Sequence, residues 1–145
     1  MKKFNFKFQK ILEYKECIED KNRIFFNMQL AVYNEEQITL NTLVEKRDHL
    51  NNERNSNLSS TTIKDLKIFN QYCLDINETI DYQKDVVLER EKDVDNAKKK
   101  LLESVKEKKT FEKLKDKCYD RYLFEVKKDE EKLVDQLVSF KNGVR

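Results

Sequence analysis

The stretch LKIFNQYCLDINETIDYQKDVVLEREKDVDNAKKKL, residues 66–101, decides the fold of this chain. Along it, positions suited to a contact between helices recur at alternating steps of three and four residues. Because this spacing lines up one narrow face of an α-helix against a partner helix, it predicts a coiled coil. The positions are Leu66, Phe69, Cys73, Ile76, Ile80, Gln83, Val87, Arg90, Val94, Ala97 and Leu101.

The composition of the whole chain agrees with long helices. The 145 residues include no proline and one glycine, Gly143, so few tight turns are possible. Charged residues make up 40% of the chain, which is also typical of disordered sequences. The net charge is only +2 and apolar residues recur at regular intervals, so we favour a folded coiled coil.

A second helical pattern precedes this stretch. Its seven-residue ladder is Phe4, Ile11, Ile18, Phe25 and Val32, with Tyr14 and Met28 three residues after two of its members. After Gln37 the stripe slips and continues through Leu40, Leu43, Arg47, Leu50 and Arg54.

The two patterns are separated by short polar residues, NSNLSSTT at 55–62, which disfavour a helix interior and supply caps. Thr62 and Asp65 resemble a capping box. We therefore expect helix one at about 5–56, a linker at 57–62 and helix two at about 63–141. Since a short linker joins antiparallel neighbours, the prediction is an all-α, single-domain (1–145), long antiparallel two-helix coiled-coil hairpin with a longer second helix.

The unequal helices leave part of helix two without a partner. Folding about residue 59 places Phe8 opposite Thr110, so we expect no internal partner after about Glu112. After Leu101 we expect the register to shift. The expected new positions are Val105, Phe111, Leu114, Cys118, Tyr122, Val126, Leu133, Leu137 and Phe140. Apolar residues without an internal partner indicate binding to another protein.

Residues needed for catalysis or for cofactors are sparse. The only histidine, His49, lies in a polar stretch, and the cysteines Cys17, Cys73 and Cys118 are too widely spaced for a metal site. We therefore expect no enzyme activity, no cofactor and no metal. Acidic residues interrupt the lysine runs, which favours a solvated helix face over a nucleic-acid site. With neither a signal peptide nor an apolar run that spans a membrane, a cytoplasmic or peripheral location is expected.

Both ends of the chain resemble the FliJ family, coiled-coil components of the bacterial flagellar export apparatus. The resemblance lies in FNFKFQKILEYKE at 4–16, LKDKCYDRY at 114–122 and EEKLVD at 130–135. It implies a stalk that binds and activates the hexameric export ATPase (FliI-like), links it to the membrane export gate (FlhA-like) and binds export chaperones. It also implies a location at the cytoplasmic face of the cell membrane.

The resemblance suggests two sets of partner-binding residues. For the ATPase these are Phe8, Leu12, Tyr14, Tyr119, Tyr122 and Asp135. For Tyr14 and Tyr122, packing between the helices is an equal alternative. For the gate the residues are Phe69, Cys73, Ile76 and Ile80. Packing is the better explanation for these four, because all of them lie at positions expected to face the other helix, which we call the seam. The alternative functions are the stalk of a virulence-type secretion system, a passive coiled-coil tether and a nucleic-acid-binding helix pair.

Overall fold

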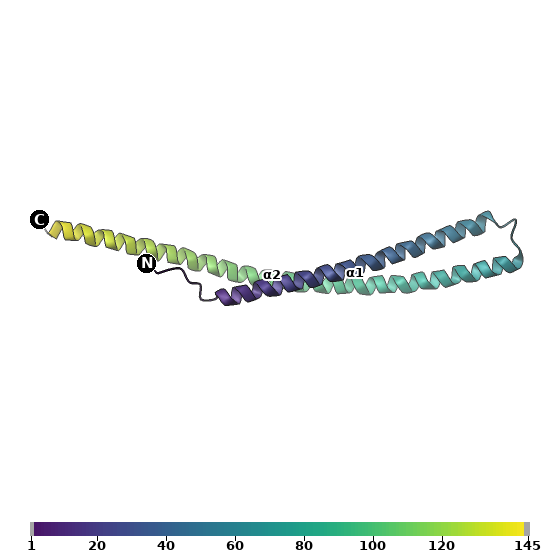
Figure 1. Cartoon of the computed structure of the whole chain (residues 1–145), viewed down its shortest axis with the longest axis horizontal. Coiled ribbons are helices and arrows are strands. Elements are labelled where there is room, and N and C mark those ends of the chain that lie inside the picture. The colour runs from purple at the N-terminus through teal and green to yellow at the C-terminus, as the bar shows by residue number, and fades with distance from the viewer. Residues whose placement is uncertain (1, 144–145) are drawn as a thin grey trace. The chain divides into compact units, whose positions relative to one another are not determined.

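The computed structural model describes residues 2–143 and contains two helices that pack against each other as a hairpin (Figure 1). Helix α1 spans Gln9–Ser56 and helix α2 spans Ile63–Gly143. The all-α hairpin with a longer second helix is confirmed. Helix α1 begins later than the expected residue 5, because residues 2–8 form a separate non-helical segment. Helix α2 ends two residues after the expected 141.

The connection between the helices is built from local polar contacts. The backbone N–H of Asn57 donates to the carbonyl of Glu53 at 3.0 Å, and the N–H of Ser60 donates to the carbonyl of Asn57 at 3.1 Å. Thr62 Oγ1 accepts from the N–H of Asp65 at 3.2 Å. The predicted cap of α2 is therefore present, and it satisfies one of the N–H groups that a helix start leaves without a partner.

The chain forms two compact units, and each is described by itself. Unit two is Asn22–Leu101. In it, every seam position predicted on α2 is buried or half-buried, with Ile80 and Ala97 only 1% exposed. On α1, the predicted stripe from Leu40 to Arg54 is half-buried as well. A polar contact interrupts this seam, since the Gln83 amide donates to the Glu36 carbonyl at 3.0 Å.

The predicted ladder in the first half of α1 is wrong. Ile11, Tyr14, Phe25 and Met28 are 41–63% exposed, and Ile18 and Val32 are half-buried. The inward positions instead recur at steps of three and four from a starting point one residue later. They are Leu12, Lys15, Glu19, Asn22, Phe26 and Gln29.

Polar partners on α2 explain this choice of face. Unit one is Met1–Lys21 with Leu102–Arg145. In it, Lys15 Nζ lies 2.9 Å from a Glu107 carboxylate oxygen, and Lys108 Nζ lies 2.5 Å from one of Glu19. In unit two, the Asn22 amide donates to the Lys100 carbonyl at 3.4 Å. A prediction based only on apolar residues omits such polar inward positions.

The expected register shift on α2 is wrong, although five of the nine positions expected after it are half-buried, namely Val105, Phe111, Cys118, Tyr122 and Val126. The steps of three and four continue after Leu101, with inward positions at Ser104, Lys108, Phe111, Lys115, Cys118, Tyr122 and Val126. Leu114 is 37% exposed, and Leu133, Leu137 and Phe140 are 57–70% exposed. The seam keeps its register because its inward positions include the polar residues Ser104, Lys108 and Lys115, so it does not need to shift to reach apolar residues.

Candidate functional site

The N-terminal strap, residues 2–8, lies along α2 in unit one and does not continue α1 (Figure 1). Its aromatic residues alternate with exposed polar ones. Phe6 is 5% exposed and Phe4 and Phe8 are half-buried, whereas Asn5 and Lys7 are exposed. A period of two residues is typical of extended backbone, so one side of the strap packs and the other faces water.

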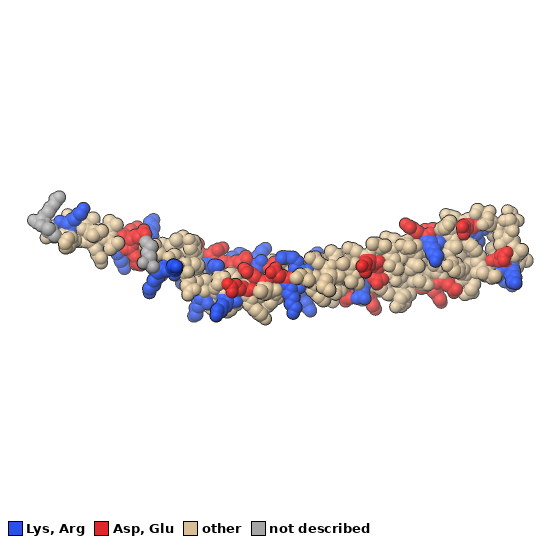
Figure 2. Space-filling view, in the orientation of Figure 1, with Lys and Arg blue, Asp and Glu red and all other residues tan. Residues whose placement is uncertain are grey.

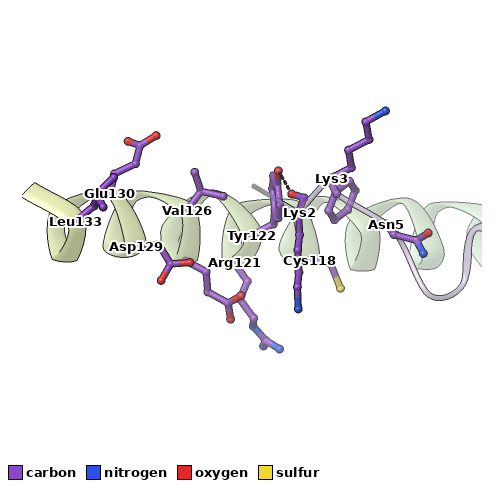
Figure 3. A pocket seen from close by; sticks show the side chains of 12 residues that line it. Lys2, Lys3, Asn5, Cys118, Arg121, Tyr122, Val126, Asp129, Glu130 and Leu133 are labelled. Carbon is purple, nitrogen blue, oxygen red and sulfur yellow. Dashed lines mark hydrogen bonds between the residues drawn. The ribbon is translucent and has the colours of Figure 1, made fainter.

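Aromatic rings hold the strap on α2. The ring centroid of Phe4 lies 5.1 Å from that of Tyr119, edge-on, and 5.5 Å from that of Tyr122. Phe8 lies 6.4 Å from Phe111. The Tyr122 hydroxyl donates a 2.7 Å hydrogen bond to the Lys2 carbonyl (Figure 3). These separations and tilted orientations are those that aromatic pairs prefer.

These contacts revise one expectation and support another. The face of α2 after Glu112 was expected to have no internal partner, but the strap covers it as far as Tyr122. The reason is that an extended segment advances about twice as far per residue as a helix, so residues 2–8 reach further along α2 than a continued α1 would. The expected pairing of Phe8 near Thr110 is confirmed by its contact with Phe111.

A groove of about 730 Å³ opens on α2 where the strap ends (Figure 3). Cys118, Val126 and Leu133 give it an apolar lining, and charged side chains border it. The strap contributes Lys2, Lys3, Phe4 and Asn5, and α2 contributes Arg121, Tyr122, Glu125, Asp129 and Glu130. The groove is therefore an open apolar surface with charges of both signs around it.

The remainder of α2, from Lys127 to Gly143, is exposed at every position. Its large apolar residues are Leu133, Val134, Leu137, Val138 and Phe140, which are 51–70% exposed. Leu133, Leu137 and Phe140 recur at steps of four and three, so they form one stripe along the helix. We call Lys127–Gly143 the α2 tail.

The residues predicted to bind the ATPase all belong to unit one, in three different environments. Tyr14 is 63% exposed, Tyr119 is 45% exposed and Asp135 is exposed on the tail. Phe8 and Tyr122 are half-buried through their contacts with α2 and the strap. Leu12 is 3% exposed and packs in the seam. The structure brings Tyr119 and Tyr122 together, with ring centroids 6.2 Å apart.

The residues predicted to bind the gate belong to unit two and lie in its seam. Cys73, Ile76 and Ile80 are 6%, 7% and 1% exposed, and Phe69 is half-buried. Since seam residues face the other helix, these side chains contact α1 rather than solvent. A neighbouring residue that sequence reasoning missed is Tyr72, which is 48% exposed, with Lys46 Nζ 5.8 Å from its ring centre.

An ion pair lies in the seam of unit one. Glu19 is 4% exposed, and the Lys108 ammonium donates to its carboxylate. This hydrogen bond raises the pKa of Lys108 above its usual value of 10.5, although burial has the opposite effect. Glu112 lies 3.8 Å from the same ammonium. A charged pair at one seam position disfavours other alignments of the two helices, since these would separate the charges.

Residues 2–143 contain neither of two other features that would point to a different function, a metal site or a membrane span. No group of three or more histidine, cysteine or acidic residues is placed to hold a metal ion among them. No helix in this described part is long and apolar enough to cross a membrane. On the face shown in Figure 2, the described acidic and basic side chains are interspersed, without a continuous basic stripe.

The fold and its exposed apolar tail define a class of protein, a coiled-coil hairpin that acts through contacts with other proteins. Within this class, the chain belongs to the FliJ family, coiled-coil components of flagellar protein export. Residues 4–143 match the family model described as "Flagellar FliJ protein". The chain is similar to the "Flagellar FliJ protein" of Bacillus subtilis (strain 168), with 26% identity over 136 residues and 92% of each chain covered. No solved structure matches the chain significantly.

Proposed function

We propose that this protein is a stalk of the flagellar export apparatus at the cytoplasmic face of the membrane. It binds and activates the hexameric export ATPase through unit one and connects the ATPase with the export gate and export chaperones. Family membership supports the setting. The observation that carries the ATPase contact is the apolar stripe of the α2 tail, which is exposed at every residue. A stripe of this kind gains stability when a partner removes it from water.

Activation follows from a difference in affinity between two states of the ATPase. A central stalk that binds the assembled ring more tightly than free subunits shifts the population toward the ring. The ATPase then reaches full activity at a lower concentration. The proposal requires no chemistry from the stalk itself.

Exposure divides the proposed ATPase residues into two roles. Tyr14, Tyr119 and Asp135 are accessible and contact the ring directly. Phe8, Leu12 and Tyr122 are half-buried or buried in the free protein, so they become available to the ring only where packing within unit one loosens. Leu137, with 57% exposure on the tail stripe, is a further contact residue outside the set that the family resemblance implies.

The proposed gate contact is on unit two. Because the buried seam holds Cys73, Ile76 and Ile80, these residues support the surface instead of touching the gate. Tyr72 and Ile68, which are 48% and 61% exposed and lie four residues apart on α2, are the proposed contacts. Phe69, between them in the sequence, is half-buried.

The experiment compares ATP turnover at increasing concentrations of the export ATPase, with and without this protein. The unchanged chain should lower the ATPase concentration that gives half-maximal specific activity. Leu137→Asp places a charge in the tail stripe and should weaken this effect by about tenfold or more. Leu88→Asp is the matched control, because Leu88 is 55% exposed on the same helix but lies in unit two. Equal stimulation by both variants would exclude the tail as the ATPase contact and favour the passive tether.

A further inference from the structure

The strap occupies the α2 face to which the proposed function assigns Tyr119 and Tyr122. The Phe4 ring packs against both tyrosine rings, at 5.1 and 5.5 Å between centroids. The hydroxyl of Tyr122 is engaged by the Lys2 carbonyl. A partner that packs on this face therefore meets a segment of the chain itself.

Side chains, not a backbone ladder, attach the strap. Among residues 2–143, its backbone hydrogen bonds to other backbone groups lie at the junction with α1, from the N–H of Gln9 to the Phe6 carbonyl and from the N–H of Leu12 to the Phe8 carbonyl. Its contact with α2 consists of ring packing and the hydrogen bond from Tyr122. The strap can thus leave α2 without breaking any hydrogen bond inside either helix.

The surface of α2 next to the strap, on the side of the α2 tail, is open. The groove that begins at Phe4 continues along α2 past Val126 to Leu133, where the exposed stripe of the tail starts (Figure 3). A partner can bind the tail and the groove first and then extend toward Tyr122. Each further contact along this path replaces a contact of the strap, so binding and release of the strap are coupled.

We propose that residues 2–8 are an intramolecular cover of α2 between Phe111 and Tyr122, and that a partner of unit one competes with this cover. The cover shields apolar side chains of α2 from water while the protein is free. The apparent affinity for the partner is the intrinsic affinity multiplied by the fraction of chains in which the strap is released. The proposal rests on the proposed function only for the identity of the partner.

The three cysteines allow docking of the strap to be measured on the full chain without any partner. Cys118 is half-buried and lines the groove together with Phe4 and Asn5. Cys17 is exposed and Cys73 is buried. Their labelling rates therefore give the fast and slow limits for a thiol in the same molecule. The measurement is the rate of maleimide labelling at each cysteine, followed by mass spectrometry of the peptides.

The test variant is Phe4→Ala/Phe6→Ala, which removes two inward rings. Its matched control is Asn5→Ala/Lys7→Ala, because both of these residues are exposed on the same segment. Loss of the rings should weaken docking by more than about tenfold. We expect the labelling rate of Cys118 to rise severalfold toward that of Cys17 in the test variant and to stay unchanged in the control. Cys73 should remain slow in both, which shows that the hairpin is intact.

A second variant, Tyr122→Phe, removes only the hydroxyl that bonds to Lys2, which should weaken docking by about twofold to tenfold. It should therefore raise the labelling rate of Cys118 by less than Phe4→Ala/Phe6→Ala does. If Cys118 is labelled at the same rate in the unchanged chain, in Phe4→Ala/Phe6→Ala and in Tyr122→Phe, residues 2–8 are not a cover and the inference is overturned. This outcome leaves the proposed function untouched, since no ATPase takes part.

Competition is then tested with the export ATPase. Release of the strap should reduce the amount of chain needed for half-maximal stimulation, so Phe4→Ala/Phe6→Ala should act at severalfold lower concentration than the unchanged chain. A need for more of the variant would show that the strap belongs to the contact, and it would overturn the competition. If no version of the chain stimulates the ATPase, the proposed function fails while the labelling result still decides whether the strap covers α2.

Discussion

The ion pair between Glu19 and Lys108 allows a quantitative test of how the seam of unit one is stabilised. Glu19 is 4% exposed, and its carboxylate accepts a 2.5 Å contact from the Lys108 ammonium. We consider Glu19→Leu, Lys108→Met and the two together. Each replacement has a similar size and can pack in the seam, so the changes alter charge more than volume.

The expected magnitudes follow from burial. Removing one partner of a fully buried pair costs about 3–5 kcal/mol, whereas replacing both by apolar residues is often neutral. Here the Lys108 side chain is 23% exposed and also lies 3.8 Å from Glu112, so solvent and a second carboxylate reduce the loss. We expect about 1–3 kcal/mol for each single change, with the larger loss for Lys108→Met because Glu19 is the more buried residue.

The double variant should lie within about 1 kcal/mol of the unchanged chain. The two residues would then be coupled by at least about 1 kcal/mol. The assay is urea unfolding followed by far-UV circular dichroism, with the slope of each transition compared among the four chains. Additive losses, with the double variant the least stable of the four, would refute the reasoning and show that each side chain contributes independently of its partner.

Three further predictions concern the seam, the cap and pH. Ile80→Ala, at a side chain that is 1% exposed, should lower stability by about 2–3 kcal/mol in this thin two-helix core, while Leu88→Ala, at 55% exposure, should stay within about 0.5 kcal/mol in urea unfolding. Thr62→Ala should cost about 0.5–2 kcal/mol by removing the cap of α2, and Thr62→Ser should restore most of it in thermal melts. Because the folded-state pKa of Lys108 is raised, its contribution is complete below pH 10.5 and lost as pH rises through the higher folded value. The unchanged chain should therefore lose stability relative to the Glu19→Leu/Lys108→Met chain only above pH 10.5, and a constant difference across that range would contradict the assignment.

For the candidate site, the sequence allowed exposure to be predicted only where it follows from the lengths of the two helices. That α2 outlasts α1 follows from the position of the polar linker at 55–62, so an exposed apolar end could be expected. The point at which exposure begins could not be predicted, because helix one was expected to start at about residue 5, inside the strap. The alternation of Phe4, Phe6 and Phe8 with polar residues was the available signal for an extended segment.

The sequence by itself determined the hairpin and the packing face of α2. In residues 66–101 almost every seam position is apolar and the three–four spacing has no fault, so one face dominates whatever lies opposite. The cap at Thr62 is likewise a local feature, since its donor and acceptor are three residues apart.

Only the tertiary structure decided which face of α1 turns inward. Two ladders compete there, an apolar one through Ile11 and Phe25 and a mixed one through Leu12 and Glu19, and they lie one residue apart. Hydrophobicity along a single chain favours the first. The second wins because Lys108 and its neighbours on α2 satisfy its polar members, and that partnership exists only once residues about 90 positions apart in the chain lie side by side.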